Sequence, residues 1–184
     1  MSSDFDIVIV GSGPAGLSAA ARAAQRGVNH VLFERTDHAS DTIYKYQKKK
    51  FVMGTPDVLP LQSDMRFEAG VREDILDAWN SGLEEHSVNI RYNSEITAIE
   101  GAKGDFTLTV NGDETIKAKH VIMSIGVQGN LRQLGVPGQD WERVQYQLDD
   151  PLEYDGETVV VVGAGDAAIE NAIGAPLGLD RPMA

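Results

Sequence analysis

The sequence predicts an α/β fold in which a parallel sheet carries helices on both of its faces. An apolar strand leads into a glycine-rich turn and a helix twice, at residues 7–20 ("IVIVGSGPAGLSAA") and 159–172 ("VVVVGAGDAAIENA"). The first of these units continues into a second apolar strand, "HVLFE", at residues 30–34. Between the two units lies an Asn-Gly pair flanked by β-patterned runs, which is typical of a hairpin.

The first unit has the pattern of a complete β-α-β motif. Residues 5–10 are short, β-branched and apolar at nearly every position, as expected of a buried parallel strand. Residues 14–26 predict a helix, because Pro14 suits the first helical position and Gly27 suits the residue just beyond the end. The expected packing stripe of this helix is Leu17, Ala20, Ala21 and Ala24.

The middle of the chain predicts one more helix, one more parallel strand and a small antiparallel meander. Residues 36–69 are expected to be irregular, and a loop of that length is usually functional. Residues 70–86 predict a helix and residues 88–92 ("VNIRY") a parallel strand. Three further runs, "SEITAIEG", "DFTLTVNGDETIKA" and "HVIMSIG", predict the meander, with Asn111-Gly112 at a turn. Residues 127–157 are loop-rich.

Composition excludes several classes of protein. The net charge of −12 disfavours a nucleic-acid or anionic-membrane partner. There is no cysteine, so disulfides, thiolate metal sites and a redox cysteine pair are excluded within this chain. No segment approaches the roughly 20 apolar residues of a membrane span, and the first residues do not resemble a signal peptide, so we expect a cytoplasmic protein. The basic run at residues 45–50 ("KYQKKK") is interpreted as a solvated loop, with a docking spot for an acidic partner as the alternative.

The glycines of the first unit predict a dinucleotide-binding site. Gly11 permits a tight turn, Gly13 leaves room for a pyrophosphate and Gly16 lets the helix pack closely on the strand. The helix start offers free N–H groups to phosphates. Glu34 ends the second strand, where a carboxylate accepts hydrogen bonds from ribose hydroxyls and repels a 2′-phosphate, which favours FAD or NAD over NADP. The candidate cofactor-binding residues of this unit are Gly11, Ser12, Gly13, Pro14, Ala15, Gly16, Glu34 and Arg35.

The second unit predicts an incomplete site for NADPH or NADH. Its candidate residues are Gly163, Gly165, Asp166 and Ala168, with alanine at the third glycine position. No second strand follows, and neither does the acidic or arginine residue that would select the nicotinamide cofactor. Gly174 and Pro176 are expected to break its helix.

These motifs, in this order, resemble the low-molecular-weight thioredoxin-reductase-like group of FAD- and NAD(P)-dependent pyridine nucleotide-disulfide oxidoreductases. "DIVIVGSGPAGLSAA" with "FER" is similar to the FAD-binding start of that family, and "GETVVVVGAGDAAIENA" to its NADPH-binding start. The resemblance covers about residues 4–173 and implies a backbone contact of Ile96 with the adenine and a place for Gly126 near the flavin. It also implies a Rossmann-like FAD-binding domain at residues 1–143 and the start of a second Rossmann-like domain at residues 144–184.

The chain departs from that group in two ways that bear on function. Thioredoxin reductases of this group carry a Cys-x-x-Cys pair just before the second glycine-rich motif, called here the second fingerprint (residues 163–168 in this chain). This chain has no cysteine there, which excludes dithiol exchange with thioredoxin. In this group the C-terminal part of the chain returns to the FAD domain and completes it. The sequence shows no such segment, so we expect a truncated member of the family. The run at residues 159–162, expected as a strand, would then be disordered, pair with this chain's own sheet or be completed by another chain.

The resemblance implies a flavin-dependent NAD(P)H oxidoreductase that passes a hydride from nicotinamide to FAD and electrons on to an unidentified small-molecule or protein acceptor. The alternatives are a non-catalytic FAD- or ADP-binding module, half of a split flavoprotein, and a flavin monooxygenase. A homodimer is one possible oligomeric state. No metal site is expected, and no side chain is assigned a catalytic role. Stacking on the flavin is one hypothesis for Tyr44, Tyr46 and Phe51, and ordinary packing is the other.

Overall fold

The computed structural model describes residues 4–54, 62–127 and 132–177. None of the helices in these three stretches is both long and apolar enough to cross a bilayer. The strands are β1 (Phe5–Val10), β2 (His30–Phe33), β3 (Phe51–Val52), β4 (Gly70–Val71), β5 (Ile90–Arg91), β6 (Ile96–Ala102), β7 (Asp105–Val110) and β8 (Glu114–Met123). The helices are α1 (Pro14–Gln25), α2 (Asp41–Tyr44), α3 (Arg72–Glu85), the 3₁₀ helix η1 (Pro151–Tyr154) and α4 (Asp166–Leu177).

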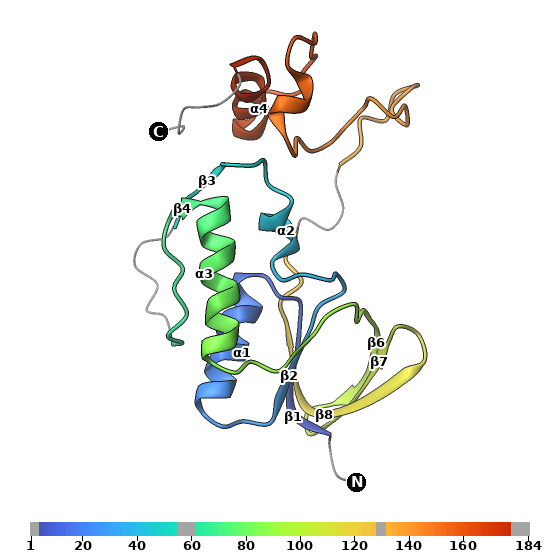
Figure 1. Ribbon diagram of the computed structural model, residues 1–184. Coiled ribbons are helices and arrows are strands. Elements are labelled where there is room, and N and C mark those ends of the chain that lie inside the picture. The colour runs from blue at the N-terminus through green and yellow to red at the C-terminus, as the bar shows by residue number, and fades with distance from the viewer. Residues whose placement is uncertain (1–3, 55–61, 128–131, 178–184) are drawn as a thin grey trace.

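The main sheet has six strands in the order β5-β2-β1-β8-β7-β6 (Figure 1). Strand β1 pairs in parallel with β2 and β8, and β2 pairs in parallel with β5. Strands β6, β7 and β8 form the expected antiparallel meander. The first residues of β8 pair with β7 and the later ones with β1, so one strand joins the meander to the parallel part.

The two faces of the sheet are covered differently. Helices α1 and α3 pack on one face around Ile9, Leu32 and Trp79. On the other face, the described residues that cover Val8 and Phe33 come from the meander, through Leu108, Val110, Ile116 and Ala118. The prediction of helices on both faces is therefore wrong for the described part of the chain, because the meander is long enough to fold back over the sheet.

Several local predictions need correction. The region predicted to be irregular, residues 36–69, contains α2 and β3, which are too short to show a period in the sequence. Strand β3 pairs with β4, which takes the first two residues of the helix predicted at 70–86, so that α3 begins at Arg72. In α1 the buried residue of the last turn is Ala23, while Ala24 is only partly buried. Helix α4 runs through Gly174 and Pro176 to Leu177, because a proline in a last turn removes one backbone hydrogen bond without ending the helix.

The valine run at residues 159–162 is not a strand and joins neither sheet. Its side chains are exposed, with Val160 at 82% and Val162 at 69%. A β-branched run forms a strand only where a neighbouring strand accepts its backbone hydrogen bonds, and within the described residues none lies beside it. Of the three alternatives for this run, pairing with this chain's own sheet is wrong for the described residues. Helix α4 and η1 instead form a small body of their own beyond α2 (Figure 1).

Candidate dinucleotide-binding site

The loop between β1 and α1 has two glycines that the fold itself requires. Gly11 has a φ of +94°, and a Cβ on it would lie 2.7 Å from the carbonyl oxygen of Ser124. A Cβ on Gly16 would lie 1.9 Å from the carbonyl oxygen of Gly11. The tight turn and the close helix packing predicted for these two positions are both present.

Gly13 is different, because nothing in the described chain demands a glycine there. It is the N-cap of α1 with a φ of −68°, which any residue adopts, and a Cβ on it would meet no atom within 4 Å. Pro14 and Ala15, which follow it, are exposed. The start of α1 therefore faces open space with free backbone N–H groups, the arrangement that a pyrophosphate requires.

The carboxylate of Glu34 lies against this loop. Its Oε2 accepts hydrogen bonds from the backbone nitrogen of Ser12 at 3.0 Å and from Ser12 Oγ at 2.5 Å. Its Oε1 accepts from the nitrogen and the Oγ1 of Thr36, each at 3.1 Å. Burial raises the pKa of Glu34, but the hydrogen bonds from Ser12 and Thr36 outweigh it and hold the pKa below its ordinary value. The site therefore holds an ionised, oriented carboxylate.

Three residues that the sequence analysis did not single out hold this arrangement together. Ser40 donates from its nitrogen to Ser12 Oγ at 3.1 Å and from its Oγ to Ser12 O at 3.1 Å. Ser124 Oγ lies 2.8 Å from the carbonyl oxygen of Val10 and 2.9 Å from that of Gly11. Thr36 is the third. Serine and threonine are common in loops, so their type alone gave no signal.

Three further residues were predicted for the FAD site: Arg35, Ile96 and Gly126. Arg35 is exposed and its nearest acid is Asp41, at 3.9 Å. Ile96 begins β6 and packs against the second core cluster, while the nearby Ser94 nitrogen donates to Glu34 O at 2.9 Å. Gly126, with a φ of +64°, follows β8 at the same end of the sheet as Gly11. The structure thus brings Glu34 and the start of β6 together.

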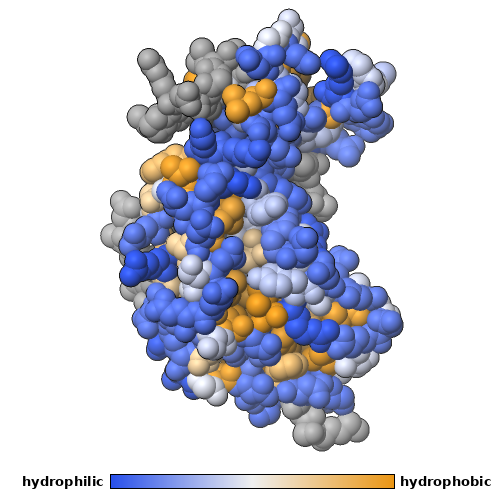
Figure 2. Space-filling view, viewed as in Figure 1, coloured by the Kyte–Doolittle hydropathy of each residue, from blue (hydrophilic) through white to orange (hydrophobic). Residues whose placement is uncertain are grey.

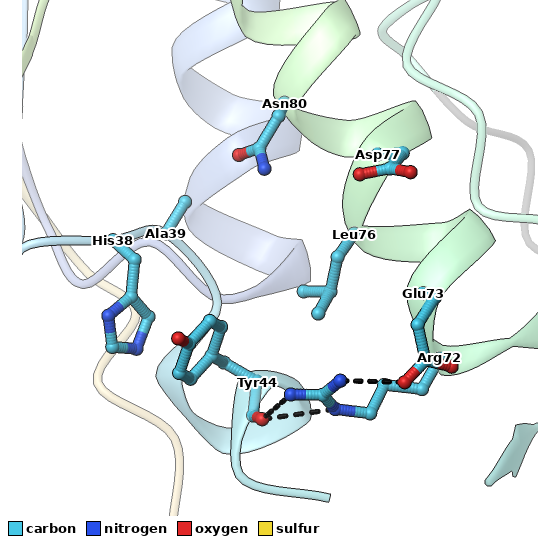
Figure 3. A pocket seen from close by; sticks show the side chains of 8 residues that line it. All are labelled: His38, Ala39, Tyr44, Arg72, Glu73, Leu76, Asp77 and Asn80. Carbon is cyan, nitrogen blue, oxygen red and sulfur yellow. Dashed lines mark hydrogen bonds and ion pairs between the residues drawn. The ribbon is translucent and has the colours of Figure 1, made fainter. Parts of the chain in front are cut away.

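A cavity of about 270 Å³ lies between the loop after β2, α2 and α3 (Figure 3). The rings of His38 and Tyr44 stack at 3.7 Å between centroids, and Arg72 donates to the backbone oxygen of Tyr44 and to Glu73. Of the other aromatic candidates, Tyr46 packs on the first core cluster and Phe51 is half exposed in β3. The structure therefore places Tyr44 at this cavity and Tyr46 against the first core cluster.

The second fingerprint is not assembled into a β-α-β unit. Gly163 has a φ of +140°, and a Cβ on it would lie 3.4 Å from the Cβ of Ala168. Gly165 is exposed and accepts the first hydrogen bonds of α4, which begins at Asp166. The turn and helix predicted here are present, but the strand that should precede them is not.

Comparison with known proteins identifies a family that the chain matches over most of its length. Residues 8–175 match the family model described as pyridine nucleotide-disulphide oxidoreductase. The chain is 29% identical to a ferredoxin–NADP reductase of Ignicoccus hospitalis, over 91% of this chain and 51% of that one.

Solved structures show the same fold. Bacillithiol disulfide reductase of Staphylococcus aureus matches with a TM-score of 0.80 and 21% identity, over 95% of this chain and 54% of that one. Thioredoxin reductase of Lactococcus lactis matches with a TM-score of 0.57 and 24% identity, over 73% and 39%. The chain thus spans about half the length of the ferredoxin–NADP reductase and of the bacillithiol disulfide reductase. By its match over residues 8–175, the chain belongs to the pyridine nucleotide-disulphide oxidoreductase family.

Proposed function

We propose that the β1-α1-β2 unit binds the ADP part of FAD, and that the chain is the flavin-binding part of an NAD(P)H oxidoreductase. One observation carries this proposal: the ionised carboxylate of Glu34, fixed by Ser12 and Thr36, lies beside a glycine loop that leaves open space at Gly13. A carboxylate at the end of the second strand suits a ribose with free hydroxyls and repels a 2′-phosphate. This supports FAD rather than NADP at the first site.

The described residues fit this group. Gly13 and the start of α1 would face the diphosphate, and Glu34 would accept the ribose hydroxyls. Thr36 Oγ1 lies 3.1 Å from Glu34 Oε1 and 2.8 Å from the carbonyl oxygen of His38. A hydroxyl has one proton and donates it to one acceptor at a time. Thr36 can therefore turn its hydroxyl proton to His38. Glu34 Oε1 then still accepts from the Thr36 nitrogen and has a lone pair available for a ribose hydroxyl.

The flavin, when bound, would supply the acceptor for a hydride from a reduced nicotinamide. The chain's own residues bind and orient that group. Because the chain has no cysteine, the electrons would pass to an acceptor outside this chain rather than to an internal thiol pair. The similarity to a ferredoxin–NADP reductase supports such an acceptor, which is a small molecule or a protein. The nicotinamide, NADPH or NADH, would bind at the second fingerprint, once a strand neighbour completes it.

A second function is favoured by one specific observation. The valine run before Gly163 is exposed and forms no strand, so the second fingerprint has no assembled sheet to support a nicotinamide. On this observation the chain alone would be a flavin- or ADP-binding module without hydride transfer.

The two functions are separated by an absorbance spectrum of the purified protein supplied with FAD, followed by anaerobic addition of NADH or NADPH. The oxidoreductase predicts bound flavin whose visible bands bleach, and the binding module predicts bound flavin whose bands persist. Glu34→Gln should lose bound flavin, while Glu100→Gln, an exposed glutamate of β6, should keep it. Absence of flavin binding by the wild-type protein would refute both the oxidoreductase and a flavin-binding module.

A further inference from the structure

The basic run between α2 and β3 contacts acidic groups near the C-terminal end of the described chain. Lys48 Nζ lies 2.6 Å from Asp150 Oδ2, and Lys50 Nζ lies 2.7 Å from Glu170 Oε2. The backbone nitrogen of Lys48 also donates to the carbonyl oxygen of Asp149 at 3.0 Å. Of the two interpretations of this run, the structure favours a docking spot, and the acidic partner is the chain itself.

Neighbouring groups orient the charged side chains of both ion pairs. Asp150 is oriented by capping η1, since its Oδ1 accepts from the nitrogen of Leu152 at 3.1 Å. Its pKa is lowered chiefly by the hydrogen bond from Lys48. Lys50 lies over the ring of Tyr46, with Nζ 4.9 Å from the centroid. The Glu170 oxygen that it faces is buried and has this ion pair, but no hydrogen-bond partner, among the described residues. Lys50 is therefore held between an aromatic ring and a carboxylate.

The junction between residues 132–177 and the rest of the described chain is polar. The hydrogen bonds and ion pairs that described residues make across it are the three contacts of Lys48 and Lys50. Neither hydrophobic core cluster includes a residue from 132–177. Figure 2 shows mainly hydrophilic atoms where the upper body meets the rest, while apolar atoms gather lower down over the sheet. Charge, rather than apolar burial, therefore joins the two parts.

We propose that Lys48 and Lys50 form an electrostatic latch that holds residues 149–170 over the segment following α2. This closed arrangement brings Asp149 to the edge of a cavity of about 180 Å³, whose other lining residues are Tyr44, Lys45, Tyr46, Lys48 and Arg72. Exposed ion pairs are individually weak and are screened by salt. The latch therefore opens as ionic strength rises. The latch does not depend on flavin binding.

The test measures the distance between the two parts directly. The chain has no cysteine, so Ser81→Cys on α3 and Ala167→Cys on α4, both at exposed positions, give two unique sites for spin labels. Pulsed electron paramagnetic resonance then gives the distance distribution at low and high salt, in the wild-type background and in three charge reversals. These are Lys48→Glu, Lys50→Glu and, as the matched control, Lys103→Glu, an exposed lysine in the turn between β6 and β7.

The latch predicts one narrow distance at low salt in the wild-type background. Lys48→Glu or Lys50→Glu should raise the population of longer distances about two- to fivefold, the range expected for one exposed ion pair. High salt should do the same, Lys103→Glu should not, and the reversed pair Lys50→Glu with Glu170→Lys should restore the narrow distance. An unchanged distribution in both lysine variants, an equal change in the control, or a broad wild-type distribution at low salt would overturn the proposal.

Discussion

At the scale of single residues, the glycines of the first loop have two different origins. Gly11 and Gly16 are required by the fold, since a Cβ on either would collide with backbone atoms. Gly13 has an ordinary φ and open space in front of it. Folding therefore does not require its lack of a side chain, and we propose that the approach of a ligand does. The sequence motif does not separate these roles, but the geometry does.

This difference predicts that Gly13→Ala separates stability from binding. The free energy of unfolding should change by less than about 1 kcal/mol, because the added methyl group meets no atom. Affinity for FAD should fall about tenfold or more, because a displaced diphosphate loses charge-assisted hydrogen bonds of about 1.5 kcal/mol or more. Calorimetric titration with FAD and urea unfolding measure the two effects. The matched control is Gly165→Ala in the second fingerprint, which also meets no atom and should leave FAD affinity unchanged.

Gly16→Ala should behave in the opposite way. Its Cβ would lie within 2 Å of a backbone oxygen, so the loop must shift, at a cost of about 3 kcal/mol. Urea unfolding monitored by tryptophan fluorescence measures this loss. A Gly16→Ala protein as stable as the wild type would show that the loop is not packed as described.

The lowered pKa of Glu34 predicts a pH-dependent contribution to stability. A carboxyl whose pKa is lower in the folded protein than in the unfolded chain stabilises fully above the unfolded-state pKa, about 4.3 for glutamate. This contribution is lost as the pH falls through the folded-state pKa. Glu34→Gln should therefore lower the free energy of unfolding by about 2 kcal/mol at neutral pH, since a charge-assisted buried network is broken.

The measurement compares urea unfolding of wild type and Glu34→Gln from neutral to acidic pH. The difference between them should shrink on acidification, whereas Glu100→Gln should differ little from the wild type throughout. A difference that grew with acid would mean that the pKa of Glu34 is raised in the folded protein.

At the scale of secondary-structure elements, β8 and the turn before it position the site. Asn111 and Gly112 have φ values of 52° and 88°, the positive values expected of an Asn-Gly pair in a hairpin turn. The side chain of Asn111 also reaches the loop before β6, accepting from Glu95 N at 2.8 Å and donating to Asn93 O at 3.0 Å. That loop lies beside the end of β2, because Asn93 N donates to Thr36 O. The hairpin thus supports the backbone next to Glu34.

Asn111→Ala should therefore destabilise the fold by about 1–2 kcal/mol, through a strained positive φ and two lost hydrogen bonds. Asp113→Ala, an exposed substitution two residues further along the same turn, should change stability by less than about 0.5 kcal/mol. Thermal unfolding followed by circular dichroism checks both. Equal effects of the two substitutions would show that Asn111 has no special role.

Elements with a strong local signal were predictable from the sequence. The β-α-β unit and the hairpin have the right period and turn residues at the right places. Helix α3 has the right period alone, since its N-cap Val71 makes no side-chain hydrogen bond. The face covered by the meander was not predictable, because it depends on how far β8 continues past its pairing with β7. Nor was the Ser12–Ser40–Glu34 network, since its members are 22 and 28 residues apart and meet only in the fold.

At the scale of the whole molecule, the sequence predicted two nucleotide-binding units, and the described chain contains one assembled unit. The valine run at residues 159–162 had every local feature of a strand, but a strand needs partners that local pattern does not reveal. The division into domains at residues 143 and 144 stays a prediction. Ion pairs of Lys48 with Asp150 and of Lys50 with Glu170 join the C-terminal part to the rest of the described chain. The sequence of the basic run alone could not identify these acidic partners.

The central claim is that the first unit binds FAD through its ADP part. The most direct test is equilibrium binding of FAD and FMN to the purified protein, followed by flavin fluorescence, with ADP-ribose as competitor. The account predicts that FAD binds, that ADP-ribose displaces it, and that FMN, which lacks the ADP part, binds at least about tenfold more weakly. Equal affinity for FAD and FMN, or no displacement by ADP-ribose, would contradict it.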